Sequence, residues 1–150
     1  METHIPPSLI KAFHQTRYTV HAHDGDFTLR IGEHSAPLQH LMAGKQSHCC
    51  ALLTAYNPAA QQVNAKVNAE NQRRLEEAVN DLGLPCCKGE NVPAGRDGPV
   101  EPSLLILGLS RQQAYALALN FHQLAFVYAD ERAVPELVWV DLKAADLRAP

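Results

Sequence analysis

The feature that most constrains the fold is an alternation of short apolar runs with helical segments. Three runs have the length of buried strands and lie at residues 49–56, 103–109 and 124–128. A long helix is expected between the first two runs, and a shorter helix between the second and the third. Because consecutive strands joined by a helix can pair in parallel through a right-handed crossover, this order predicts β-α-β units.

Both expected helices have recognisable faces and ends. At ~100° per residue, one stripe of the long helix is apolar and the opposite side is charged. The apolar stripe contains Leu75, Ala78, Val79 and Leu82. Gly83 and Pro85 should stop this helix. The shorter helix opens with Ser110-Arg111-Gln112-Gln113, which has the form of a capping box, and should run to about Phe121.

The amino-terminal part predicts an antiparallel hairpin. Residues 18–23 and 26–31 flank Asp24-Gly25, a pair suited to a type I′ turn. A two-residue turn would place Ala22 opposite Phe27, Val20 opposite Leu29 and Tyr18 opposite Ile31, all on one face. With short helices at 8–15 and 37–43 and a last strand at 137–142, we expect a mixed α/β fold. Its sheet should have about six strands, with both parallel and antiparallel pairs.

Length and charge bound the class of protein. The chain has 150 residues, 46% of them apolar and 19% charged, with a formal net charge of -3. These values predict one domain over residues 1–150, with a core at about 8–142 and flexible termini. There is no basic stripe for nucleic acid, and no apolar run approaches the ~20 residues of a membrane span. We therefore expect a cytoplasmic protein that binds neither nucleic acid nor membrane.

Polar residues gather where the first central strand ends. Asn64, Asn68 and Asn71 fall on the same helical stripe as the leucines, so a helix packed antiparallel to its strand would bring them beside Thr54 and Asn57. A buried unpaired amide costs about 1–3 kcal/mol. The cluster should therefore satisfy itself or meet water or a ligand. Alternatively, the helix begins only near Asn68 and Asn64 lies in a loop.

Each of the other polar residues in this region has a plain structural interpretation beside a functional one. Asn57 and Pro58 have the residue types of a helix start, with Asn57 as N-cap. Glu101 precedes a central strand, where a carboxylate could act as general base or ligand contact, or could be an exposed loop acid. Gln123 could contact a ligand or simply end a helix. No glycine-rich phosphate loop or other cofactor motif occurs in the sequence, so we expect no cofactor.

A second cluster involves cysteines. Residues 86–99 are rich in Gly, Pro, Asn and Asp and predict a surface loop. An antiparallel strand and helix could bring two cysteine pairs and a histidine to one side, which would form a metal site. These residues are His48, Cys49, Cys50, Cys86 and Cys87. Adjacent cysteines point in different directions, unlike a Cys-x-x-Cys zinc knuckle, so ordinary buried thiols are favoured and no metal is expected.

The chain resembles a bacterial family catalogued as domain of unknown function 3293. The resemblance lies in Leu53-Thr54-Ala55-Tyr56-Asn57-Pro58, the helix from Asn68 to Leu75, Glu101-Pro102-Ser103-Leu104-Leu105, and the segment from Ala114 to Tyr128 with Gln123. It implies a shared fold and gives weight to Thr54, Asn57, Asn68 and Glu101. It implies no reaction.

Three functions follow as hypotheses. The first is a binding or accessory module whose polar pocket, at the carboxyl edge of the sheet, holds a small polar ligand or a partner segment, because amides recognise well but do not exchange protons. The second is a small hydrolase or transferase with Glu101 as general base. The third is a structural or protein-interaction subunit.

Overall fold

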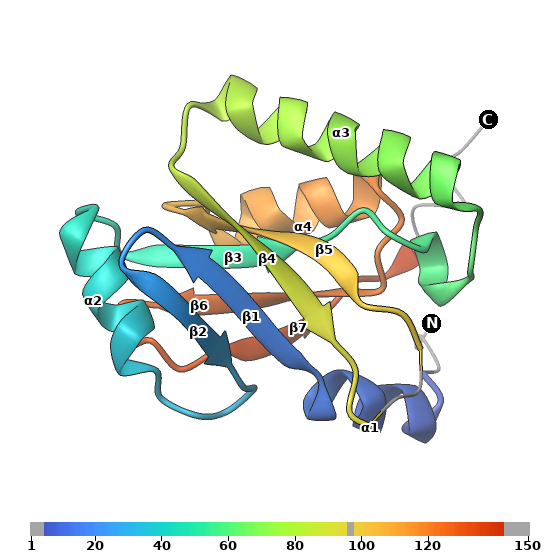
Figure 1. The fold of residues 1–150 in the computed structure, drawn as a ribbon, viewed down its shortest axis with the longest axis horizontal. Helices are drawn as coiled ribbons and strands as arrows, with labels where there is room; N and C mark the ends of the chain where they lie inside the picture. The colour runs from blue at the N-terminus through green and yellow to red at the C-terminus, as the bar shows by residue number, and fades with distance from the viewer. Residues whose placement is uncertain (1–4, 96–97, 143–150) are drawn as a thin grey trace.

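A single seven-stranded sheet organises the computed structural model, which describes residues 5–95 and 98–142 (Figure 1). The strand order is β2-β1-β4-β5-β3-β6-β7. The strands are β1 (Arg17–Ala22), β2 (Gly25–Leu29), β3 (Cys49–Leu53), β4 (Cys86–Val92), β5 (Glu101–Leu107), β6 (Ala125–Asp130) and β7 (Glu136–Trp139). The mixed α/β class is confirmed, with one strand more than expected.

Every neighbouring pair of these strands is antiparallel, so the expectation of parallel pairs is wrong. The β-α-β units are nevertheless present in a split form. β3 and β4 run in the same direction on either side of β5, and β5 and β6 run in the same direction on either side of β3. Each helix therefore crosses over one intervening antiparallel strand.

The strand missing from the prediction is β4, whose residues were expected to form a surface loop. It lies between β1 and β5 and pairs with both. Gly89 is needed there, because a Cβ at that position would lie 2.3 Å from the Thr19 carbonyl oxygen and 3.0 Å from Ser103 Oγ. A glycine inside a strand often marks such a close approach, whereas by propensity alone it indicates a loop.

The amino-terminal hairpin forms with its pairing shifted by two residues. Tyr18 pairs with Leu29 and Val20 with Phe27, so the connecting residues are His23 and Asp24 rather than Asp24 and Gly25. A shift of two preserves the face on which each side chain lies. Tyr18, Val20 and Leu29 are accordingly buried together, as the expected register also required.

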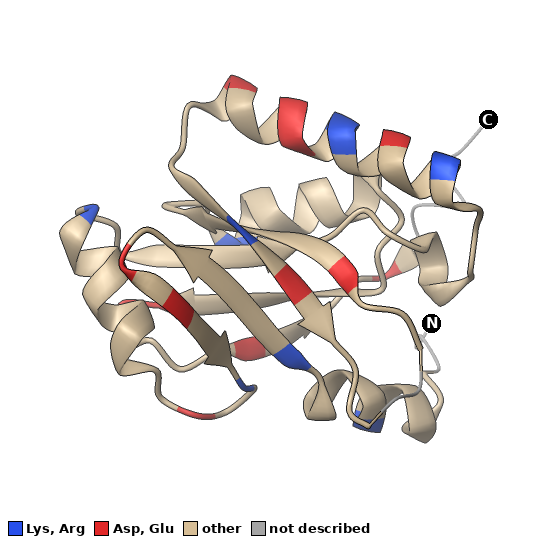
Figure 2. Ribbon diagram, viewed as in Figure 1, with Lys and Arg blue, Asp and Glu red and all other residues tan. Residues whose placement is uncertain are grey.

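Within the described residues, four α-helices and one 3-10 turn with assigned bounds accompany the sheet. They are α1 (Pro7–Gln15), α2 (Ala36–Gly44), η1 (Pro58–Ala60), α3 (Ala65–Leu82) and α4 (Arg111–Asn120). Ser110 and Gln113 form the expected capping box of α4. Gly83, at φ 71°, ends α3 in the left-handed conformation that favours glycine. Charged residues line the outward side of α3 (Figure 2).

The helices divide the core into two clusters, one on each face of the sheet. On one face, Leu75 and Val79 of α3 and Ala114 of α4 pack against β3, β5 and β6. On the other, Leu38 and Met42 of α2 pack against β1, β2 and the opposite sides of the central strands. α1 lies at one end of the sheet, where its Phe13 ring meets Trp139 of β7 edge-on at 5.2 Å between centroids.

Two backbone hydrogen bonds draw the edges of the sheet toward each other. The Gly32 amide donates to Pro135 and the Ser35 amide to Ala133, at 2.8 and 2.9 Å. The segment after β2 therefore lies against the segment before β7, and the sheet curls. No helix within residues 5–95 and 98–142 is long and apolar enough to cross a membrane. The carboxyl-terminal residues 143–150, for which the sequence predicts a flexible terminus, are outside the described residues.

Candidate functional site

Asn57 adopts a strained backbone conformation, and its side chain does not cap a helix. Its φ and ψ are 47° and 66°, its side chain makes no capping bond, and only the 3-10 turn η1 follows. Asn tolerates the left-handed region better than most residues, but a following proline disfavours helical conformations at the preceding position. Asn57 therefore holds the N-cap position of η1, with Pro58 as the first residue of the turn, but its side chain makes no capping bond and is available for other contacts.

Asn57 and Asn68 form a closed pair of amides. The Asn57 backbone amide donates to Asn68 Oδ1 at 2.8 Å, and Asn68 Nδ2 donates back to Asn57 Oδ1 at 2.9 Å. Both residues are buried. The pair fastens the connection after β3 to the first turns of α3, which explains how Asn57 is held in its unfavourable conformation.

The network continues from Asn57 to Glu101, the first residue of β5. Asn57 Nδ2 donates to Glu101 Oε2 at 2.7 Å, and Asn57 Oδ1 also accepts from the Val63 backbone amide at 3.3 Å. Glu101 is half-buried. Burial raises its pKa above the ordinary value, and the hydrogen bond from Asn57 opposes the rise in part.

Thr54 and Gln72 further attach the connection after β3 to β5 and to α3. Thr54 Oγ1 donates to the Pro102 carbonyl at 2.7 Å and accepts from the Tyr56 amide at 3.1 Å, while Gln72 Oε1 accepts from the Ala55 amide at 3.0 Å. Sequence analysis missed Gln72. Its position was a sufficient signal, because residues 68, 72, 75 and 79 follow the 4-3-4 spacing of one buried helical stripe.

Gln123, in the turn between α4 and β6, reaches the connection after β3. It is buried, and its Nε2 donates to the carbonyls of Tyr56 at 3.1 Å and Phe121 at 3.3 Å. Because Gln123 lies two residues before β6, it joins the segment leading into that strand to the connection after β3. The amide thus bridges two segments and does more than end a helix.

Two of the three asparagines of the predicted cluster lie apart from it. Asn64 is exposed and is the N-cap of α3, where its Oδ1 accepts from the Val67 amide at 2.8 Å. The helix therefore begins at Ala65, not near Asn68. Asn71 is partly exposed and has no hydrogen-bond partner among the described residues. Only Asn68 turns into the buried network.

The edge at which these residues meet is not a carboxyl edge of the whole sheet. β3 and β4 end there, but β5 and β6 begin there, since the sheet is antiparallel. The rule that ligands bind beyond the carboxyl ends of parallel strands does not apply to this arrangement.

A pocket of about 310 Å³ opens beside Glu101. It lies between α1 and the connection after β3. Leu9 and Phe13 of α1, together with Leu124, provide apolar walls. The polar residues that line it are Tyr56, Asn57, Gln62, Glu101 and Gln123. Asn57, Glu101 and Gln123 of the network therefore border a space large enough for a small molecule, whereas Thr54, Asn68 and Gln72 do not line it.

Strained backbone is concentrated around this pocket. Besides Asn57, three other residues without glycine's freedom have positive φ here: Ala59 at 55°, Ala60 at 60° and His122 at 52°. The Ala59 amide donates to the His122 carbonyl at 2.6 Å, so the two strained segments hold each other. Each such residue costs on the order of 1–3 kcal/mol, and such conformations gather at functional sites.

The cysteines form no comparable site. Cys50 and Cys87 lie on the α2 face of the sheet, whereas Cys49 and Cys86 point the other way, and β5 separates the two pairs. His48 is exposed and meets Glu131 at 3.2 Å. Within the described parts of the chain, no group of three or more His, Cys, Asp or Glu is arranged to hold a metal ion.

Comparison with known proteins identifies one family. The model described as "Protein of unknown function (DUF3293)" matches residues 53–126. This range contains all seven of the predicted ligand contacts, from Thr54 to Gln123. Neither a curated protein nor a solved structure matches the chain.

Proposed function

Starting from the place of residues 53–126 in the DUF3293 family, we propose that this chain is a binding module for a small ligand, held in the pocket beside Glu101. The observation that supports this most strongly is the state of the Glu101 carboxylate. Only its Oε2 is engaged among the described residues, by Asn57 Nδ2. An oxygen without a protein partner, on a half-buried carboxylate at a pocket wall, can accept hydrogen bonds from a ligand in place of water.

The amides near Glu101 were expected to contact the ligand directly, but they support binding by holding the pocket in shape. Asn57 and Asn68 already satisfy each other, so they hold the site in shape and are not free to contact a ligand. The ligand contacts left are Glu101, Tyr56, Gln62 and Gln123. A volume of about 310 Å³ is at the small end of ligand pockets, which favours a compact molecule.

A pocket-filling variant tests this proposal. Leu9→Trp should block the pocket and abolish the thermal shift or NMR shift that any small-molecule hit produces with the native protein. Ile10→Trp is the matched control, since Ile10 neighbours Leu9 on α1 but is exposed and outside the pocket. If every hit bound equally well to the native protein and to Leu9→Trp, the pocket would not be the binding site.

An enzymatic role has one observation in its favour. Burial raises the pKa of Glu101, and a carboxyl group with a raised pKa exchanges protons more readily near neutral pH. In this second hypothesis Glu101 is the general base of a small hydrolase or transferase. Glu101→Gln should then eliminate turnover of a substrate while leaving its binding largely intact. Unchanged turnover in that variant would exclude Glu101 as the base.

A further inference from the structure

We infer that the ligand of the Glu101 pocket is a small organic ammonium, a primary amine with an apolar body. This inference rests on the proposed function, because it specifies what the same pocket binds. It depends on three properties of the pocket: the charge of its lining, the hydrogen-bonding groups left unengaged, and the nature of its walls.

The lining carries a single charge. Among the described residues that line the pocket, Glu101 is the only acidic one and no lysine, arginine or histidine is present. An anionic ligand would meet a half-buried carboxylate with no basic side chain in the lining to offset the repulsion. A cation would meet the opposite charge in a partly desolvated place, where the attraction is stronger than in water.

The unengaged groups are mainly hydrogen-bond acceptors. Glu101 has one free carboxylate oxygen, and Gln123 uses its Nε2 on two backbone carbonyls, which leaves its Oε1 without a partner among the described residues. The Tyr56 hydroxyl and the exposed Gln62 amide can serve in either role. An ammonium group has three donors and no acceptor, so it complements this set, whereas a carboxylate or phosphate does not.

The walls suit the remainder of such a molecule. Leu9 and Leu124 are aliphatic, and the rings of Phe13 and Tyr56 offer faces to which cations are attracted. The position of Phe13 is fixed by its ring contact with Trp139. A body the size of a benzyl group or a short alkyl chain fits a space of about 310 Å³.

Three probes of nearly equal shape test the inference: benzylamine, benzyl alcohol and benzoate. Each would be titrated at neutral pH into ¹⁵N-labelled protein, with the side-chain amide signals of Asn57 and Gln123 as reporters. We expect benzylamine to bind at least about tenfold more tightly than benzyl alcohol, and benzoate to cause no shift. In Glu101→Gln, benzylamine should lose that advantage, while the affinity for benzyl alcohol stays within about twofold.

The outcomes separate the two proposals. Equal affinities for benzylamine and benzyl alcohol in the native protein would overturn the ammonium inference and leave the pocket as a binding site. An advantage for benzylamine that persists in Glu101→Gln would overturn it as well. If none of the three probes shifted the Asn57 and Gln123 signals, the proposed pocket would fail, and the ammonium inference with it.

Discussion

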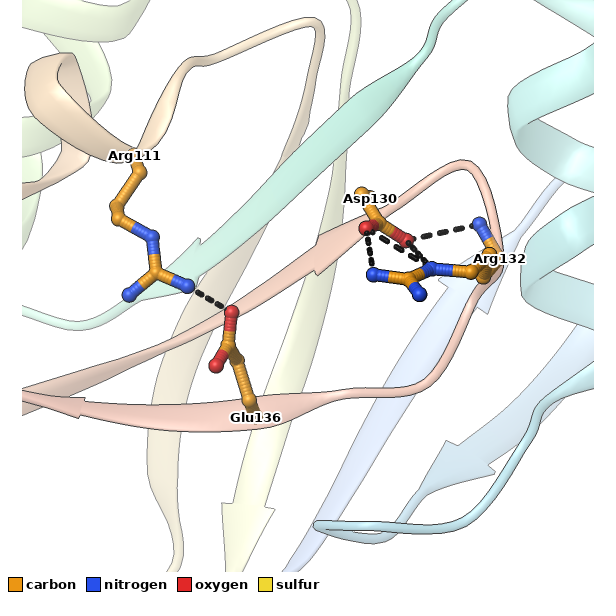
Figure 3. Close-up of polar contacts among 4 residues, drawn as sticks. All are labelled: Arg111, Asp130, Arg132 and Glu136. Atoms are coloured by element: carbon orange, nitrogen blue, oxygen red, sulfur yellow. Dashed lines mark hydrogen bonds and ion pairs between the residues drawn. The ribbon is translucent and has the colours of Figure 1, made fainter.

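The two ends of β3 carry polar clusters of opposite kinds. Beyond its carboxyl end, Asn57, Asn68 and Glu101 form a buried and half-buried network. At its amino end, Cys49 pairs with Asp130, which belongs to a group of exposed ion pairs (Figure 3). There, Asp130 contacts Arg132 at 2.8 Å, and Arg111 contacts Glu136.

The contrast shows that the contribution of a polar contact to the stability of the fold depends more on burial than on the strength of the single bond. When an exposed ion pair is broken, water replaces the lost partner, and such pairs contribute little. When a buried amide loses its partner, no water is at hand and the full cost of desolvation appears. The network after β3 should therefore stabilise the fold, while the ion pairs before β3 should contribute little to the free energy of unfolding.

The largest effect is expected from Asn68→Ala. This change leaves the Asn57 backbone amide without its acceptor and removes one donor to Asn57 Oδ1. At about 1–3 kcal/mol for each buried group left unpaired, the free energy of unfolding should fall by about 2–4 kcal/mol. Urea denaturation followed by circular dichroism measures it. Asn71→Ala, one turn further along α3, is the control and should change it by less than about 0.5 kcal/mol.

Asn64→Ala should have an intermediate effect. Asn64 caps α3 by accepting from the Val67 amide, and loss of an N-cap costs about 1 kcal/mol. The same denaturation experiment applies. A loss as large as that of Asn68→Ala would mean that capping, not the buried network, is what the asparagines contribute, and the contrast between the two ends of β3 would weaken.

Glu101→Gln should alter the dependence of stability on pH. Since burial raises the pKa of Glu101 in the folded state, the folded protein holds this proton more tightly than the unfolded chain does. The resulting stability is present below the ordinary carboxyl pKa and is lost as pH rises through the folded-state pKa. The Tm of the variant minus that of the native protein should therefore increase as the pH rises above the ordinary carboxyl pKa and through the raised pKa of the folded state. A constant or decreasing difference contradicts the assignment.

Arg132→Ala should have the smallest effect. The Arg132 side chain is 83% exposed, and its bonds to Asp130 are open to solvent. Its Tm should stay within about 1 °C of the native value, at low and at high salt. A drop of several degrees would show that the exposed end of β3 contributes as much as the buried end.

Local signals predicted most elements well. The capping box at Ser110, the stop at Gly83 and the two faces of the first hairpin depend on nearby residues, and all three form. β4 could not be found in this way, because it is a strand only through its neighbours β1 and β5. Without β4, β3 and β5 look like consecutive strands joined by one helix, an arrangement that predicts a parallel pair. In the structure, β4 reverses the direction of the chain before β5 begins, so β5 runs antiparallel to β3.

The sequence predicted part of the polar network after β3, but it also assigned Asn64 and Asn71 to that network, and both lie apart from it. The helical period placed Asn68 in the core correctly, and it also contained Gln72, which was overlooked. Asn57 has the residue type of an N-cap and is followed by proline, so its left-handed backbone had no local signal. Its bond to Glu101 joins residues 44 positions apart, a contact that only the tertiary structure sets.

The place of β4 in the sheet also determines when the fold can form during synthesis. Tyr18 pairs with Asn91, so the first hairpin waits for its inner neighbour until more than 60 further residues have been translated. At about 5–20 residues per second, that interval lasts several seconds. Throughout it, the edge of β1 that will pair with β4 has unpaired backbone hydrogen-bonding groups. A ribosome-bound chain that stops before Val92 should therefore be a good substrate for chaperones.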